Sequence, residues 1–336
     1  MKFLVTGGAG FIGSNFLHYM VRKYPEDYFV CVDSLTYAGN YDNIVTLETY
    51  DNFKFVYGDI RNADEINSLF LREKFDVVVN FAAETHVDTS IKNPNAFLET
   101  NVLGTVNLLN SVKKMETIYK VKRFHQVSTD EVYGDLPLDR TDLSFDENSP
   151  LHPSSPYSAS KTSADLFVLA YARTYKIPVT ISRCSNNYGA YQFPEKLVPL
   201  TILRALNNEK IPIYGNGKNV RDWIHVKDHN IGVDMIIRHG KNGEVYNLGG
   251  NSEKENIEVV KSILKILNKS EDLIEYVSDR KGHDLRYSMN YNKAKMMLGW
   301  EPKIDFKAGL KETINWYLNN KKWLENLENR KSDINV

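Results

Sequence analysis

The first half of the chain alternates short, continuous apolar runs with longer segments in which apolar residues recur at helical spacing. The apolar runs predict buried strands at residues 2–6, 28–32, 53–57, 76–80, 123–128 and 179–183. The segments between them predict helices at 11–20, 64–73, 95–114 and 156–175. Because continuous apolar strands alternating with helices are typical of a parallel sheet covered on both faces, the pattern predicts an α/β fold with a Rossmann-like, doubly wound parallel sheet.

The pattern changes in the second half of the chain. Helices are predicted near 197–208, 226–239, 256–267 and 305–319, separated by short strands and loops such as 211–218. We therefore expect a main domain at 1–185, with returning segments near 220–250, and a smaller mixed α/β lobe at 186–325. The polar residues 326–336 are expected to form a frayed C-terminal tail.

Composition excludes several classes of protein. The 336 residues carry a net charge of −1, with charged residues spread along the chain, so nothing favours a nucleic-acid partner. The two cysteines, Cys31 and Cys184, are expected to be buried thiols. No apolar stretch is typical of a signal peptide or a membrane span, so we expect a cytoplasmic protein without a membrane partner.

The first predicted strand ends in the glycine-rich run GGAGFIG at 7–13, which opens the first predicted helix. A turn without Cβ atoms lets backbone N–H groups approach a pyrophosphate, and the helix N-terminus attracts that anion. Asp33 follows the second predicted strand, about 20 residues after Gly13, where a carboxylate can bind a ribose 2′-hydroxyl. Because the same carboxylate repels a 2′-phosphate, the pattern indicates NAD rather than NADP.

Tyr157 and Lys161 lie four positions apart in a predicted helix and therefore share one face. A free phenol titrates near pH ~10, so a tyrosine base at neutral pH needs about 4 kcal/mol of stabilisation. The Lys161 ammonium and a cationic nicotinamide would both favour the phenolate, and Lys161 can also bind a ribose hydroxyl. The pair predicts removal of a proton from a hydroxyl while hydride leaves the same carbon.

The strand at 123–128 ends in the run STDE at 128–131. Carboxyl ends of strands in a doubly wound sheet face the ligand crevice, so we expect these side chains near the cofactor and the substrate. Thr129 can hydrogen-bond the reacting oxygen. Asp130 and Glu131, if both face the cleft, push their pKa values apart and provide an acid and a base. Beside a redox pair they predict elimination of water from an oxidised sugar; a helix cap or a surface charge is the structural alternative.

Together these motifs resemble the extended short-chain dehydrogenase/reductase family, and within it the nucleotide-sugar 4,6-dehydratases. The resemblance spans nearly the whole chain, and its most specific stretch is STDEVYG at 128–134. Supporting stretches are AAETHVD at 82–88, NNYG at 186–189, RDW at 221–223 and DRKGHD at 279–284. Thr89 and Lys281 depart from the family pattern, in which arginine and proline are usual.

The resemblance implies a hydro-lyase with tightly bound NAD that is regenerated in each cycle. The implied substrate is dTDP-glucose, which would be oxidised at C4, lose water across C5 and C6, and receive hydride at C6. The product, a 4-keto-6-deoxy sugar nucleotide, would feed deoxysugar biosynthesis such as that of dTDP-rhamnose. The resemblance also implies a homodimer through the helices near 95–114 and 156–175.

The resemblance assigns roles to individual positions. The implied catalytic residues are Thr129, Asp130, Glu131, Tyr157 and Lys161. The implied cofactor-binding residues are Gly7, Gly10, Phe11, Ile12, Gly13, Asp33, Ser34, Leu35, Thr36, Asp59, Ile60, Ala82, Ala83, Thr100, Tyr157, Lys161 and Asn187. The implied substrate-binding residues are Thr85, Thr129, Asn186, Lys196, Leu197, Pro212, Tyr214, Arg221, Asn256, Arg280 and His283.

Other interpretations stay open on the sequence. A UDP-glucose 4,6-dehydratase, an epimerase or a decarboxylase would share the fold, although the Asp130-Glu131 pair argues against the last two. A non-catalytic dinucleotide-sensing protein is the alternative from another class. His86 stands between Glu84 and Asp88, but without a second His–carboxylate motif we expect structural hydrogen bonding and no metal site. The acidic segment 139–147 is expected to be a solvated loop over the cleft.

Overall fold

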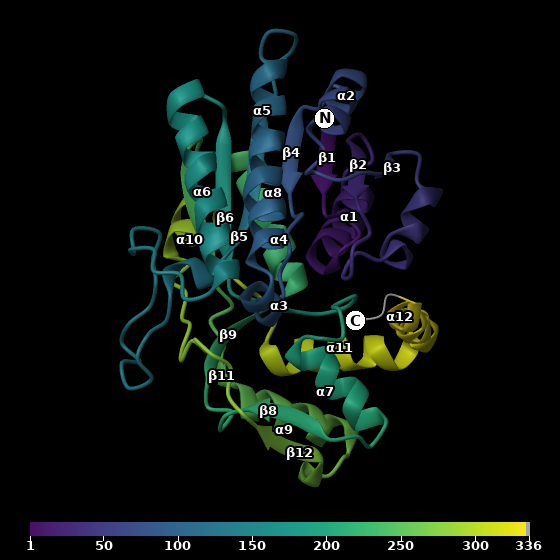
Figure 1. Cartoon of the computed structure of the whole chain (residues 1–336), viewed down its shortest axis with the longest axis vertical. Helices are drawn as coiled ribbons and strands as arrows, with labels where there is room; N and C mark the ends of the chain where they lie inside the picture. The colour runs from purple at the N-terminus through teal and green to yellow at the C-terminus, as the bar shows by residue number, and fades with distance from the viewer. Residues whose placement is uncertain (334–336) are drawn as a thin grey trace.

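The computed structural model describes residues 1–333 and contains a large parallel sheet with a smaller lobe below it (Figure 1). The strands of the large sheet are β1 (Lys2–Thr6), β2 (Tyr28–Asp33), β3 (Phe53–Tyr57), β4 (Val77–Asn80), β5 (Arg123–Thr129), β6 (Val179–Cys184) and β10 (Glu244–Leu248). Their order is β10-β6-β5-β4-β1-β2-β3, and every pair is parallel. The chain changes direction of winding between β1 and β4, which places a ligand crevice at the carboxyl ends of these two strands.

Helices cover both faces of this sheet. One face carries α1 (Phe11–Lys23), α8 (Val226–His239) and α10 (Asn292–Leu298), and the other carries α2 (Ala63–Glu73), α5 (Thr105–Met115) and α6 (Pro156–Tyr175). Phe3 and Val5 of β1 pack into the first buried cluster, whereas Leu4 packs into the second. Because successive side chains of a strand point to opposite faces, the uninterrupted apolar run of β1 requires a helical layer on each side.

The smaller lobe is formed by segments after β6, and α8, β10 and α10 of the large sheet lie between them in the chain. Its helices are α7 (Leu197–Leu206), α9 (Asn256–Leu267), α11 (Phe306–Asn319) and α12 (Lys321–Asp333). Its strands form a three-stranded sheet of β7 (Asn186–Tyr188), β9 (Val220–His225) and β11 (Glu253–Glu255), and a parallel pair of β8 (Ile211–Tyr214) and β12 (Ile274–Val277). The predicted mixed α/β character of this region is therefore confirmed.

The helix predicted at 95–114 is not regular. It comprises α4 (Pro94–Phe97), a π-helical turn at Leu98–Gly104 and α5, and the short helix α3 (Val87–Lys92) precedes it. A π-helical turn shifts side chains relative to a regular helix and is frequently found at functional sites. Four 3₁₀ turns, which the sequence pattern did not predict, lie at Tyr41–Asn43, Val45–Thr49, Asp130–Tyr133 and Glu271–Leu273.

The C-terminal segment differs from the expected frayed tail. Helix α12 continues to Asp333, and Trp323, Leu324 and Leu327 are buried against α7 and α11. These three apolar side chains recur at helical spacing, which anchors a segment that is otherwise polar. Residues 334–336 of the expected tail lie outside the described residues.

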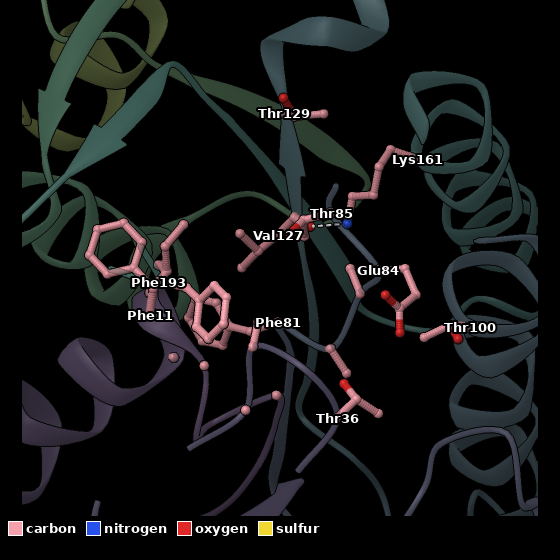
Figure 2. Close-up of a pocket in the computed structure, with 18 of the residues that line it drawn as sticks. Phe11, Thr36, Phe81, Glu84, Thr85, Thr100, Val127, Thr129, Lys161 and Phe193 are labelled. Carbon is pink, nitrogen blue, oxygen red and sulfur yellow. Dashed lines mark hydrogen bonds between the residues drawn. The ribbon is translucent and has the colours of Figure 1, made fainter. Parts of the chain in front are cut away.

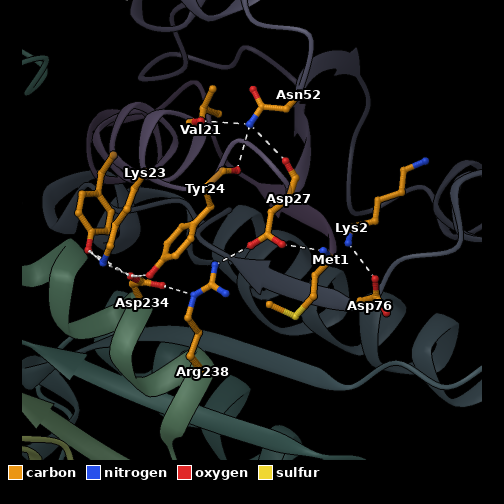
Figure 3. A network of polar contacts seen from close by, with 11 residues as sticks. Met1, Lys2, Val21, Lys23, Tyr24, Asp27, Asn52, Asp76, Asp234 and Arg238 are labelled. Carbon is orange, nitrogen blue, oxygen red and sulfur yellow. Dashed lines mark hydrogen bonds and ion pairs between the residues drawn. The ribbon is translucent and has the colours of Figure 1, made fainter.

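A polar network joins α1 to α8 at the amino ends of the strands, whereas the glycine-rich turn lies at their carboxyl ends (Figure 3). Arg238 contacts Asp234 (Nε–Oδ1, 2.8 Å) and Asp27 (Nη2–Oδ2, 2.6 Å). Lys23 contacts the second oxygen of Asp234 (Nζ–Oδ2, 3.0 Å). The network therefore fixes the α1–β2 turn to α8 far from the ligand crevice. Within residues 1–333, no helix has the length and apolar character needed to cross a membrane.

Candidate active site

Two adjoining pockets, of about 310 and 280 Å³, open at the carboxyl ends of the central strands and continue into the smaller lobe. Both are lined by Thr85, Glu131, Asn186, Asn187, Gln192, Glu195 and Lys196, so the two cavities meet along these side chains. Figure 2 shows part of the larger pocket, which we call the dinucleotide pocket. The smaller one lies between α3, α7 and the loop at 279–284, and we call it the substrate pocket.

The glycine-rich turn leaves room for an anion in the dinucleotide pocket. Gly7 has a φ of +68°, and a Cβ there would lie 2.5 Å from the backbone nitrogen of Ala82. A Cβ on Gly13 would lie 2.3 Å from the carbonyl oxygen of Gly7. No side chain caps α1 at Gly10, so its first N–H groups face the pocket. The turn therefore fits a pyrophosphate.

Asp33 ends β2 at the far side of the same pocket. Its carboxylate accepts hydrogen bonds from the backbone N–H groups of Ala9 (2.9 Å) and Leu35 (2.8 Å). These bonds hold the carboxylate at the pocket wall, where a ribose hydroxyl could donate to it. The residues present therefore fit an NAD molecule.

Sixteen of the seventeen predicted cofactor-binding residues line the dinucleotide pocket. They are Gly7, Gly10, Phe11, Ile12, Gly13, Asp33, Ser34, Thr36, Asp59, Ile60, Ala82, Ala83, Thr100, Tyr157, Lys161 and Asn187. Leu35 is the exception and lines neither pocket, because its side chain packs against the buried cluster between the sheet and α1. Its backbone takes a φ of +49°, which turns the chain back after Asp33.

Helix α6 presents Tyr157 and Lys161 to the dinucleotide pocket. The helix begins here because Ser155 and Ser158 form a reciprocal capping box and Pro156 occupies the first turn. Tyr157 and Lys161 are buried, and the Lys161 ammonium donates a hydrogen bond to the carbonyl oxygen of Val127 (2.8 Å; Figure 2). The two side chains thus stand one helical turn apart at the end of β5.

The surroundings of Tyr157 set its charge state in the absence of a cofactor. Burial, and next the Glu131 carboxyl, raise the pKa of Tyr157 well above its ordinary value. Burial lowers the pKa of Lys161, whose ammonium is held by the Val127 carbonyl. The protein alone therefore keeps Tyr157 as a neutral phenol, and the phenolate requires an additional positive charge in the pocket, such as a cationic nicotinamide.

The run at 128–131 forms a tight turn at the end of β5. Thr129 caps this turn: its hydroxyl accepts from the backbone N–H of Glu131 (3.3 Å) and donates to Asp130 Oδ1 (3.1 Å). Asp130 is buried, and within residues 1–333 its second oxygen has no hydrogen-bond partner. Thr129 and Asp130 line the dinucleotide pocket, whereas Glu131 lines both pockets.

The pKa values of both carboxyls are raised by their surroundings. Burial, and next the charge of Glu131, raise the pKa of Asp130 well above its ordinary value. Burial, and next the charge of Asp284, raise the pKa of Glu131. Because two close carboxyls in one cleft resist simultaneous ionisation, one of them stays available as a proton donor while the other accepts.

The predicted substrate-binding residues also gather at these cavities. Thr85, Asn186, Lys196, Leu197, Pro212, Tyr214, Arg221, Asn256, Arg280 and His283 line the substrate pocket, and Thr129 lines the dinucleotide pocket. Arg221 donates to the carbonyl of Asp284 (2.9 Å), and Arg280 pairs with Asp88 (Nε–Oδ1, 2.9 Å). These cations give the pocket walls the charge that a nucleoside diphosphate requires.

Several residues that sequence reasoning missed connect the two lobes. Tyr37, from the loop after β2, donates to Glu195 Oε1 (3.2 Å) and lies 3.2 Å from the hydroxyl of Thr85. The predicted residues Lys196 and Thr85 are also in contact, since Lys196 donates to the carbonyl of Thr85 (3.1 Å). Gln192 lines both pockets as well. Glu195 was identifiable only as the neighbour of Lys196, and Tyr37 carries no local motif.

The remaining expectations concern structural residues. His86 caps α3 by accepting from the backbone N–H of Thr89 (3.1 Å), and no cluster of metal-ligating side chains occurs within residues 1–333. Cys31 and Cys184 are free and buried, as expected. The segment 139–147 is a mostly exposed loop, as expected, but its position over the cleft was predicted wrongly: it lines neither pocket, and its Phe145 packs against Tyr133.

Comparisons with known proteins agree with this geometry. The model of the family described as GDP-mannose 4,6 dehydratase matches residues 4–313. A dTDP-glucose 4,6-dehydratase from Escherichia coli is 46% identical over an alignment 345 residues long, gaps included. The alignment covers 96% of this chain and 95% of the relative.

Two solved structures are similar over nearly the whole chain. The dTDP-glucose 4,6-dehydratase from Bacillus anthracis, in complex with NAD, has a TM-score of 0.89 and 48% identity, covering 97% of this chain and 99% of its own. The dTDP-glucose 4,6-dehydratase from Streptomyces venezuelae, with NAD bound, has a TM-score of 0.92 and 44% identity, covering 97% and 100%. The chain therefore belongs to the family described as GDP-mannose 4,6 dehydratase, and within it is similar to the dTDP-glucose 4,6-dehydratases.

Proposed function

We propose that this protein is an NAD-dependent dTDP-glucose 4,6-dehydratase, which converts dTDP-glucose to water and dTDP-4-keto-6-deoxy-glucose. The observation that carries the proposal is the position of Asp130 and Glu131. Glu131 lies where the dinucleotide pocket meets the substrate pocket, and the adjacent Asp130 lines the dinucleotide pocket together with Tyr157. A simple dehydrogenase needs no such acid–base pair, whereas a dehydratase needs it at this junction.

The dinucleotide pocket holds the cofactor through residues already described. The turn at Gly7–Gly13 would receive the pyrophosphate, Asp33 would bind the adenosine ribose, and Lys161 would lie at the nicotinamide half. When bound, NAD accepts hydride from C4 of the sugar and returns it to C6. The protein's own contribution is to orient the two molecules and to move protons.

Three side chains of the site can carry out the proton transfers that the reaction requires. Tyr157, as phenolate, takes the proton of the C4 hydroxyl, and Thr129 hydrogen-bonds the same oxygen. The C4 ketone acidifies the C5–H bond, so Glu131 can remove that proton. Asp130, whose pKa burial raises, donates a proton to the C6 hydroxyl as water leaves. A proton then returns to C5.

The substrate pocket provides the contacts for the nucleoside diphosphate. Arg221 and Arg280 lie on its wall with Lys196, and their guanidinium groups can bind phosphate oxygens in bidentate geometry. Leu197 and Pro212 contribute apolar surface for the base. Thr85 lies on both pockets and is placed to contact the glucosyl ring.

One incubation tests this proposal. The purified protein is given dTDP-glucose and UDP-glucose in separate reactions, and the products are analysed by mass spectrometry. Loss of one water from dTDP-glucose is expected. A product of unchanged mass that separates from the substrate by chromatography would indicate an epimerase, and preferential conversion of UDP-glucose a different nucleotide specificity. A third reaction with UDP-glucuronic acid, whose sugar carries a carboxyl group, would reveal a decarboxylase by loss of carbon dioxide. Absence of any turnover would favour a dinucleotide-sensing protein.

The quaternary structure is part of the same proposal. Leu98 and Leu103 in the π-helical turn, and Leu166 and Phe167 on α6, are exposed apolar residues on adjacent helical segments. A homodimer that packs these segments against a second copy would bury them. Leu166→Glu should yield a monomer in sedimentation experiments, whereas Met296→Glu, at an exposed methionine on α10, should not. A wild-type monomer would contradict the dimer.

A further inference from the structure

Helix α6 carries a buried carboxyl for which the proposed mechanism has no role. Asp165 lies one turn after Lys161 and two turns after Tyr157, and its side chain is fully buried. It accepts hydrogen bonds from the hydroxyl of Ser128 (3.0 Å) and from Nε of Arg183 (3.0 Å). Ser128 is the residue directly before Thr129, so this carboxyl connects α6 to the catalytic turn and to β6.

Two buried cations lie near this carboxyl: Arg183 contacts it directly, and Lys161 stands one turn earlier on α6 with its ammonium on the Val127 carbonyl. Lys161 and Arg183 are only 4% and 3% exposed, and a buried cation without a counter-ion loses much of the hydration that stabilises its charge. Arg183 cannot release its proton under ordinary conditions, but a lysine can. The protonation of Lys161 is therefore the property that depends on a neighbouring negative charge.

We propose that Asp165 is a positioning residue that keeps Lys161 protonated and fixes the catalytic turn to α6 through Ser128. This inference rests on the proposed function, because it assigns Asp165 to the support of the Tyr157–Lys161 pair.

The surroundings of Lys161 agree with this role. Burial lowers its pKa, and the charge of Asp165 opposes that effect more strongly than Cys184 does. The thiol of Cys184 is itself neutral at physiological pH, since burial raises its pKa to about 12. Burial raises the pKa of Asp165 as well, but Arg183 and Lys161 favour its ionised form. The direct contact with the Arg183 guanidinium favours a carboxylate at Asp165, whose negative charge would oppose the effect of burial on Lys161.

Asp165→Asn tests the proposal because it keeps the shape of the side chain and its hydrogen bond from Ser128 but removes the charge. The primary measurement is the pKa of Lys161 in the cofactor-free protein, followed by NMR of isotope-labelled lysine side chains. The Lys161 signal is identified by its absence in Lys161→Met. Loss of a negative charge one helical turn away should lower the pKa of Lys161 by about one unit or more.

A control variant separates this effect from general loss of a buried ion pair. Asp234 is also buried and paired with an arginine, but it lies in the α1–α8 network, at the amino ends of the strands and away from the active site (Figure 3). Asp234→Asn should lower thermal stability without moving the Lys161 pKa. An unchanged Lys161 pKa in Asp165→Asn, or an equal fall in both variants, would overturn the proposal.

A double-mutant cycle adds a kinetic test. If Asp165 acts through Lys161, the variant Asp165→Asn/Lys161→Met should have the same kcat as Lys161→Met alone. Multiplicative losses in kcat would show that Asp165 is merely structural. The alkaline limb of kcat should also move to lower pH in Asp165→Asn, and an unmoved limb counts against the proposal. The NMR result needs no substrate, so a failure of the proposed function leaves it interpretable.

If Asp165→Asn does not fold, the same question can be tested in a variant that also lacks the buried charge of Arg183. In Asp165→Asn/Arg183→Met the carboxyl and the permanent cation are both absent, which relieves the unpaired charge. Lys161 remains without its counter-ion in this variant, so its pKa should again lie below that of the wild type. A wild-type value there would contradict the role of Asp165.

Discussion

The side chain of Asn101 and the backbone of Glu84 are joined by two reciprocal hydrogen bonds. Glu84 N–H donates to Asn101 Oδ1 (2.8 Å), and Asn101 Nδ2 donates to the Glu84 carbonyl (3.0 Å). Asn101 Nδ2 also donates to Ser160 Oγ (2.8 Å), which in turn donates to the Tyr157 carbonyl (2.7 Å). The π-helical turn that contains Asn101 therefore couples the loop after β4 to the helix that carries Tyr157.

Asn101→Ala should weaken cofactor retention and lower stability. The substitution leaves a buried donor and acceptor of the Glu84 backbone without partners, which costs about 1–3 kcal/mol. The loop at 82–85 lines the dinucleotide pocket, so NAD should dissociate faster as well. Calorimetric unfolding and the NAD content of purified protein measure the two effects. Asn110→Ala, at an exposed position on α5, is the matched control, and equal effects of both variants would contradict the coupling.

Glu131→Gln should stop the reaction after oxidation of C4. Glutamine cannot accept the C5 proton, whereas Tyr157 and Lys161 remain in place, so reduced cofactor should accumulate on the enzyme. Loss of the base should lower turnover by about 10²–10⁴-fold. Stopped-flow absorbance of the reduced nicotinamide follows this directly, with the exposed-carboxyl variant Asp139→Asn as control. Full turnover without accumulation would remove Glu131 from the role of base.

Asp130→Asn should stabilise the cofactor-free protein at neutral pH. The pKa of Asp130 is raised in the folded state, so the folded protein binds this proton more tightly than the unfolded chain does. The folded state therefore loses stability as the pH rises from the pKa of an unfolded aspartate towards the raised pKa of Asp130. Asparagine cannot ionise, and its Tm should exceed that of the wild type at neutral pH. The difference should vanish below about pH 4, where wild-type Asp130 is protonated folded and unfolded. A pH-independent difference in Tm would contradict the raised pKa.

Tyr157 should remain a phenol in the cofactor-free protein beyond about pH 10, because its pKa is raised by burial and by Glu131. Bound NAD should lower that pKa through the positive charge of the nicotinamide. The chain contains 20 tyrosines, so the titration is measured as an absorbance difference between wild type and Tyr157→Phe. A phenolate signal at neutral pH without NAD would show that Lys161 alone is sufficient.

The sequence predicted the parts of the site that depend on local pattern. The glycines between β1 and α1, Asp33 at the end of β2, and the four-residue spacing of Tyr157 and Lys161 each have a short-range physical reason. The structure places these side chains on one pocket because the carboxyl ends of parallel strands meet at one edge. Their chemical roles stay predictions.

The parts that the sequence did not predict depend on tertiary contacts. The sequence around Asn101 has a regular helical pattern and does not indicate a π-helical turn. In the structure this turn places Asn101 in contact with Glu84 and Ser160, which lie far from it in the sequence. Leu35 follows Asp33 directly, yet its left-handed backbone directs the side chain into the core. Leu327 lies in a polar segment, and its burial by the neighbouring helices converts an expected tail into part of α12.

The central claim is that the protein couples oxidation at C4 to elimination across C5 and C6 within one site. The direct test uses dTDP-glucose that carries deuterium at C4, with the position of the label in the product determined by NMR. Deuterium is expected at C6 of the product, together with solvent deuterium at C5 when the reaction runs in heavy water. A label that stays at C4 or is lost to free cofactor would contradict it.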